Sequence, residues 1–213
     1  MSAVLTDVCV HAMLDSAVSG APGTALFVGA HTALGIAGAE VAGGSPAYAR
    51  KAITWQAAGT PTARSKSITA PVIFDIPAGT TVRGIVLWSA LTAGTARAWA
   101  PAGASARRAF SVDTTGLTNN DIFSPAHGLV AGNSVCFWPT IGAVLPTPLA
   151  EDTEYFVIAA GLTTDAFRVS ATLGGASIDI TAIGDGDVQK FTPEVYGGQG
   201  TYQATDFPIS LPG

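Results

Sequence analysis

Charge is scarce in this chain of 213 residues, because Asp, Glu, Lys and Arg make up 12% of it, about half the share that is usual in soluble domains. The ten basic residues are scattered, and Arg50-Lys51 and Arg107-Arg108 are the adjacent pairs. Since phosphate binding requires a basic patch or stripe, we expect no nucleic-acid partner. Hydrophobic residues reach 48%, and the cores of protein interfaces are depleted in charge. We therefore expect other subunits to cover much of the surface.

Long apolar runs are also absent from the sequence. The longest, residues 25–30 and 155–160, fall far short of the roughly 20 residues that a membrane-spanning helix requires. The N-terminus has no basic region and reaches Asp7 early, unlike a secretory signal. We expect no membrane insertion.

Cysteine is rare, and the two that occur are far apart. Cys9 and Cys136 both lie among apolar residues, which favours buried free thiols, although the sequence leaves a disulfide open.

The sequence contains no nucleophile elbow, phosphate loop or Cys-x-x-Cys motif. The acidic residues near glycine lack the spacing of a calcium loop, and we expect the stretch Gly184-Asp185-Gly186 to be a solvated turn. His127 is expected to be a turn histidine that bonds the backbone. We predict a protein that is not an enzyme and holds no cofactor and no metal. The enzyme alternative is a cell-wall hydrolase that uses carboxylates among Glu151, Asp152 and Glu154.

The pattern of apolar residues predicts a mainly β fold with one N-terminal helix. Helical spacing between Leu5 and Met13 predicts that helix. Beyond Thr24, alternating apolar residues and turn signals predict a β-sandwich domain. The expected strands cover residues 25–30, 68–76, 82–88, 95–101, 134–138, 154–159, 166–170 and 177–181, followed by a long terminal strand.

Residues 25–55 contain the most specific pattern in the chain. A short apolar strand is followed by a loop of small residues and then a second strand, with these motifs in order: His31-Thr32, Glu40-Val41, Gly43-Gly44-Ser45, Tyr48-Ala49-Arg50 and Trp55. This order resembles a minor tail or tail-fibre protein family of tailed bacteriophages, and the resemblance continues at Pro77–Val82, Leu87-Trp88 and Gly200–Tyr202. It implies a virion protein, more on the tail than on the head, that forms a symmetric homo-oligomer and contacts other virion proteins.

In that family the closing strand follows soon after the position of Trp99, whereas here it is displaced. We therefore predict that residues 1–109 and 192–213 form one discontinuous β-sandwich assembly domain, and that residues 110–191 form an inserted β domain. The inserted segment, with His127-Gly128-Leu129, is similar to a small β module of phage fibre and baseplate proteins. Domains tolerate insertions where loop ends lie close together at the surface.

Five residues are candidates for contacts with partners. Those expected at an interface are Trp99, His31, Tyr48 and Arg50. Trp138 is the candidate contact to a ligand or receptor, because aromatic rings stack on the apolar faces of ligands such as sugars. Trp55 and Trp88 are expected in the core.

Two other functions remain open from the sequence. One is a head decoration or cementing protein of the capsid. The other is a carbohydrate-binding module that attaches to a host surface glycan.

Overall fold

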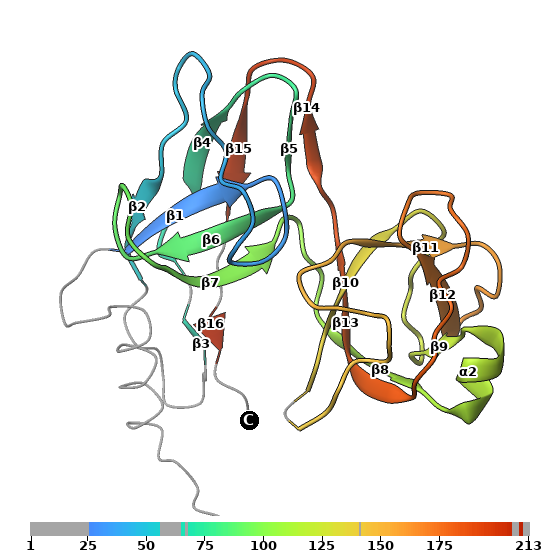
Figure 1. Ribbon diagram of the computed structural model, residues 1–213. Helices are drawn as coiled ribbons and strands as arrows, with labels where there is room; N and C mark the ends of the chain where they lie inside the picture. The colour runs from blue at the N-terminus through green and yellow to red at the C-terminus, as the bar shows by residue number, and fades with distance from the viewer. Residues whose placement is uncertain (1–25, 56–64, 67, 141, 206–208, 211–213) are drawn as a thin grey trace, which may run out of the picture. The chain divides into compact units, whose positions relative to one another are not determined.

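The computed structural model describes residues 26–55, 65–66, 68–140, 142–205 and 209–210 (Figure 1). The chain forms two compact units, which we call unit 1 (Met1–Ala100 with Glu194–Gly213) and unit 2 (Pro101–Pro193). Strands dominate both, so the predicted mainly β class is confirmed. The predicted N-terminal helix and Cys9 lie outside the described residues. No described helix is long and apolar enough to span a membrane.

A four-stranded sheet forms one part of unit 1. Its strands are β2 (Lys51–Ile53), β1 (Leu26–His31), β6 (Gly84–Trp88) and β7 (Ala96–Pro101), in the order β2-β1-β6-β7. The central strands β1 and β6 pair antiparallel, with Val28 opposite Leu87. Four consecutive residues of β6 are buried, which is the pattern of a strand covered on both faces.

A two-stranded ribbon forms the rest of unit 1. Strand β4 (Val72–Ile76) pairs with β15 (Gly200–Ala204), and β5 (Thr80–Val82) pairs with β14 (Glu194–Tyr196). Val72 lies opposite Ala204 and Val82 lies opposite Glu194. Ten residues separate the two positions on each segment, so the antiparallel register is continuous from one pair of strands to the next. Between these pairs the ribbon turns at residues 77–79 and 197–199, the ribbon corner (Figure 1). The short strands β3 (Ser65–Lys66) and β16 (Ile209–Ser210) pair further along the same two segments.

Unit 2 is a closed antiparallel barrel. Its strands follow the order β10-β11-β12-β9-β8-β13, and β13 closes the barrel on β10. Their bounds are β8 (Arg108–Val112), β9 (Ile122–Phe123), β10 (Ser134–Trp138), β11 (Tyr155–Ile158), β12 (Ala166–Ser170) and β13 (Gly184–Phe191). Closure removes the exposed edges that open sheets leave.

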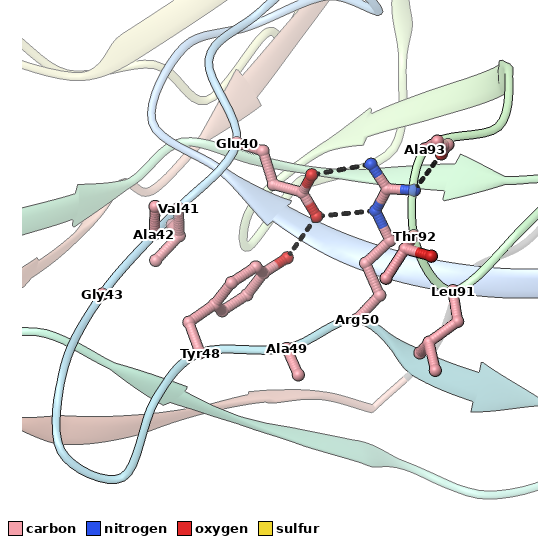
Figure 2. Close-up of a pocket in the computed structure, with 10 residues that line it drawn as sticks. All are labelled: Glu40, Val41, Ala42, Gly43, Tyr48, Ala49, Arg50, Leu91, Thr92 and Ala93. Atoms are coloured by element: carbon pink, nitrogen blue, oxygen red, sulfur yellow. Dashed lines mark hydrogen bonds and ion pairs between the residues drawn. The ribbon is translucent and has the colours of Figure 1, made fainter.

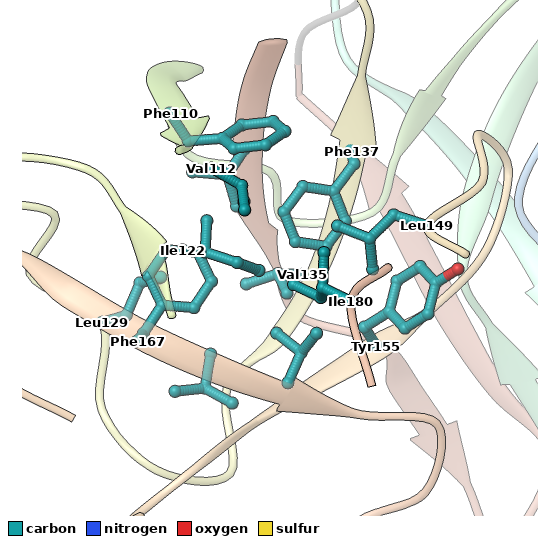
Figure 3. Packing of buried hydrophobic residues seen from close by; sticks show 13 residues of the cluster. Phe110, Val112, Ile122, Leu129, Val135, Phe137, Leu149, Tyr155, Phe167 and Ile180 are labelled. Carbon is teal, nitrogen blue, oxygen red and sulfur yellow. The ribbon is translucent and has the colours of Figure 1, made fainter. Parts of the chain in front are cut away.

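Thirteen buried hydrophobic residues, four of them aromatic, form the core of the barrel (Figure 3). The ring of Phe137 packs edge-on against Phe110 and Tyr155, at centroid distances of 5.1 Å and 5.6 Å. These are the separations at which aromatic pairs attract one another. A short helix, α2 (Thr114–Asn119), connects β8 to β9 and is capped by the Asp113 carboxylate, which accepts from two backbone N–H groups.

Several sequence-based expectations need correction. Residues 177–181 form no strand; the strand at this point in the chain is β13, which begins at Gly184, inside the predicted turn. Asp185 and Asp187 are therefore strand residues. The predicted 82–88 strand is interrupted at Arg83, and the helix α2 was not predicted. The described residues of unit 1 form one four-stranded sheet and three two-stranded sheets, and this arrangement does not establish the predicted sandwich.

The two ends of unit 2 are hydrogen-bonded to each other. Thr192 N donates to Ala102 O at 3.0 Å, and Ser105 N donates to Lys190 O at 2.8 Å. The unit therefore begins and ends at one place, at residues 101 and 193.

Candidate functional site

The loop between β1 and β2, residues 32–50, carries the candidate site of unit 1. Its base is fastened to β1 by two backbone hydrogen bonds, from Thr32 N to Ala39 O (2.9 Å) and from Val41 N to Ala30 O (3.0 Å). An antiparallel bridge places Glu40 opposite His31. The middle of the loop therefore lies beside the strand from which the loop started, and Glu40, Tyr48 and Arg50 come together.

Arg50 and Glu40 form a two-pronged ion pair (Figure 2). Arg50 Nε donates to Glu40 Oε1 and Arg50 Nη2 to Glu40 Oε2, each at 2.8 Å. This geometry matches a planar guanidinium to a carboxylate and is the stronger form of such pairs. Tyr48 adds a third contact: its hydroxyl donates to Glu40 Oε1 at 2.9 Å and accepts from Ala30 N at 2.8 Å.

Arg50 also fastens the hairpin between β6 and β7. Its Nη1 donates to the carbonyl oxygens of Ala90, at 3.0 Å, and Ala93. The guanidinium carbon lies 3.6 Å from the ring centroid of Trp88, within the range of a cation–π contact. One side chain therefore connects the β1–β2 loop, strand β6 and the β6–β7 hairpin.

Gly29 of β1 provides the space for this cluster. A Cβ atom at this position would lie 2.7 Å from Glu40 Oε1 and 2.9 Å from Tyr48 Oη. Both oxygens are held by hydrogen bonds, so they cannot move aside without breaking the network.

The surroundings shift the pKa values of three groups. Burial would raise the pKa of the Glu40 carboxyl, but hydrogen bonds from Arg50 and Tyr48 outweigh it and lower that pKa below its usual range. Burial and the neighbouring Glu40 carboxylate raise the pKa of Tyr48. Burial lowers the pKa of His31, although the charge of Glu40 opposes this. Around neutral pH the cluster is therefore a neutralised ion pair beside a neutral tyrosine and a neutral histidine.

An open pocket of about 440 Å³ lies over this cluster (Figure 2). Ala42, Gly43, Ala49 and the hairpin residues 91–93 line it together with the ion pair. Its polar groups bond one another, and the described residues contain no group of three His, Cys, Asp or Glu side chains placed to hold a metal ion. The arrangement joins backbone segments together and contains no activated nucleophile.

The structure separates the five predicted contact residues. Tyr48 and Arg50 belong to the cluster, whereas His31 is 1% exposed and packs against Trp88 at a centroid distance of 5.8 Å. Trp99 is half-buried in β7, at the edge of the sheet. Glu40, at the centre of the cluster, was not among the predicted contact residues, because the spacing of residues 40, 48 and 50 matches no known motif.

Trp138 lies in unit 2, where neighbouring side chains engage it. Its indole N–H donates to Gln189 Oε1 at 3.1 Å, and the guanidinium carbon of Arg107 lies 3.8 Å from the ring centroid.

His127 is a turn histidine that bonds the backbone, as predicted. It is buried, and its Nδ1 accepts from Leu129 N at 2.9 Å. Cys136 is a buried free thiol, and burial raises its pKa to about 12. The surroundings of both residues therefore fit a structural role and not a reactive one.

Comparison with known proteins identifies the family. No curated protein and no solved structure matches the chain. The family model of the podophage GP4 fiber I protein gp80 matches residues 1–123, which include the candidate site and extend into the first strands of the barrel. The chain therefore belongs to this family of phage fibre proteins and is a non-enzymatic structural protein of the virion tail.

Proposed function

We propose that the chain is a fibre subunit that assembles as a symmetric oligomer and contacts its neighbours through the ribbon corner of unit 1. The remaining strands of unit 1, packed as a β-sandwich, form the support for this corner. Unit 2 is an inserted spacer or knob.

The observation that carries this proposal is a surface without charge at the ribbon corner. Three loops meet there, and none of their residues is charged: residues 43–47, 77–79 and 197–199. The Gln199 side chain connects two of them, because its Oε1 accepts from Ser45 N at 3.3 Å and its Nε2 donates to Pro46 O at 3.2 Å. A surface without charge suits the core of a protein interface, where charged residues are depleted.

Gly197 and Gly198 support the same conclusion. Neither has the positive φ that favours glycine, and a Cβ atom on either would meet no atom within 4 Å. Within the described part of the chain, neither backbone conformation nor packing explains why glycine occupies both positions. Close approach of another protein's backbone would explain it, because only glycine lets two backbones come that near.

The test is to substitute Gly198→Leu and measure the mass of the purified protein by light scattering. The side chain has room in the single chain, so the melting temperature should stay within about 2 °C of the wild type. The oligomer should dissociate. Ala109→Leu, at an exposed position of β8 in unit 2, is the matched control and should leave the mass unchanged. A wild-type monomer that also fails to bind purified tail proteins, or a Gly198→Leu oligomer of normal mass, would refute the proposal.

Labelling on the virion distinguishes this function from the alternatives. Antibody against the chain should decorate the tail, as the family assignment indicates, and not the head. If the chain is instead a carbohydrate-binding module, it should bind host glycans and lose that binding in Trp138→Ala or Trp99→Ala.

A further inference from the structure

We propose that His31 is a pH-sensitive latch at the base of the β1–β2 loop, and that protonation of its ring under mildly acidic conditions releases the loop from β1. This device is separate from assembly through the ribbon corner.

The ring of His31 is buried in unit 1, beside the loop backbone at Gly38, which favours a proton on the ring. It is 1% exposed, and neither Nδ1 nor Nε2 has a hydrogen-bond partner among the described residues. Its neighbour Trp88 presents a ring, not an acceptor, at a centroid distance of 5.8 Å. A neutral imidazole tolerates this environment better than a charged one, because burying an unpaired charge costs far more than burying an unpaired polar group.

Two charged side chains act on the ring, and they oppose each other. The carboxylate of Glu40 favours a protonated ring, whereas the guanidinium of Arg50 disfavours it. Both carboxylate oxygens of Glu40 already accept hydrogen bonds: one from Arg50, and the other from both Arg50 and Tyr48. The backbone at Gly38 also favours the charged ring, but burial outweighs these contributions and lowers the pKa of His31.

The position of His31 determines what its protonation would disrupt. It is the last residue of β1, and the backbone bridge to Glu40 closes the loop at this point. Opening the bridge would free the adjoining bonds, from Val41 N to Ala30 O and from Thr32 N to Ala39 O. It would also expose Leu34 and Val41, which are now buried.

The sign of the pH dependence follows from linkage. In the open loop, His31 has an ordinary pKa near 6.5 and binds a proton more readily than in the closed loop. Opening is therefore favoured as the pH falls below about 6.5, by at most tenfold per pH unit, because one proton is taken up. Above about pH 7 the latch stays closed.

The first measurement is amide hydrogen exchange in the full chain between pH 7.5 and 5.0, expressed as protection factors. In the wild type, the protection of the Thr32 and Val41 amides should fall by about tenfold or more over this range. In His31→Phe, which keeps a ring and removes the titration, it should stay constant. The amide of Ile178, which donates to Val169 O in the barrel, is the internal control and should not respond.

The second measurement uses the wild-type protein, so its result does not depend on whether the variant folds well. The imidazole nitrogens of wild-type His31 are followed by NMR against pH, with assignment from the variant. The ring should stay neutral to a pH clearly below 6.5. A native-state pKa of 6.5 or above, or the same loss of loop protection in a folded His31→Phe, would overturn the proposal.

Discussion

The guanidinium carbon of Arg50 lies 3.6 Å from the ring centroid of Trp88, while the same guanidinium holds Glu40 with two hydrogen bonds. The Arg50 side chain is 9% exposed and the Glu40 side chain 25% exposed, so solvent only partly screens their attraction. Lysine at this position could neutralise Glu40, but it could not bind both oxygens and donate to the β6–β7 hairpin at once. Together these contacts explain why arginine suits position 50 better than lysine does.

Arg50→Ala should destabilise unit 1 by about 2 to 4 kcal/mol, because it leaves the Glu40 carboxylate and two hairpin carbonyls without their donor. Denaturant unfolding, followed through the NMR signals of unit 1, measures the change. Arg168→Ala is the matched control, since Arg168 pairs with Asp121 in the barrel with both side chains more than a quarter exposed. It should cost no more than about 1 kcal/mol. Equal losses in the two variants would contradict the buried role of Arg50.

Gly29→Ala should destabilise the protein by about 1 to 3 kcal/mol, because the added methyl group collides with the hydrogen-bonded oxygens of Glu40 and Tyr48. Differential scanning calorimetry gives the shift in melting temperature. Gly197→Ala provides the comparison, since its methyl group has open space. A melting temperature for Gly29→Ala no lower than that of Gly197→Ala would mean that the cluster can move aside.

Tyr48→Phe should raise the pKa of Glu40 and make unit 1 more sensitive to acid. The hydroxyl of Tyr48 donates to the carboxylate, so its removal disfavours the ionised form. In the wild type the folded pKa of Glu40 is lowered, so its contribution to stability is complete above the unfolded value near 4.5 and is lost as the pH falls through the folded value. The variant should lose this contribution at a higher pH. Carboxyl NMR titration of Glu40 checks the direction, and an unchanged midpoint would be the contrary result.

Much of the strand pattern could be predicted from alternating apolar residues. Strands β10, β11 and β12 lie where alternation and turn residues place them, whereas β4 covers only Val72–Ile76 of the strand predicted at residues 68–76. In β13 the same reasoning failed, because Gly184 and Gly186 signalled a turn. The structure shows another reason for glycine: a Cβ atom at Gly184 would lie 2.5 Å from Val144 O, so the strand passes closely beneath another segment. Such contacts between distant segments leave no mark in local sequence.

The cluster around Arg50 was only partly predictable. The sequence indicated Tyr48 and Arg50 as contact residues, and the structure joins both to Glu40. Their convergence depends on a loop that returns to β1, and on Gly29, which the sequence places in a predicted strand without indicating that its lack of a side chain makes room for Glu40 and Tyr48. Helix α2 escaped prediction for a different reason: its six residues include three threonines and a glycine, which have low helix propensity, and the Asp113 cap is its main local signal.

The hydrogen bond from Thr192 N to Ala102 O predicts that unit 2 can be removed without unfolding unit 1. If unit 2 is an insertion, its two ends lie close enough for a short linker to replace it. A chain in which four Gly and Ser residues join Ala100 to Glu194 should keep the NMR signals of β1 and β6 in place. Residues 101–193 alone should unfold cooperatively, because their barrel is closed and has its own core. Phe137→Ala, which removes the central ring of that core, should lower the stability of the isolated barrel by about 3 to 5 kcal/mol. Loss of the β1 signals in the shortened chain would show that unit 1 depends on the barrel and would refute the insertion.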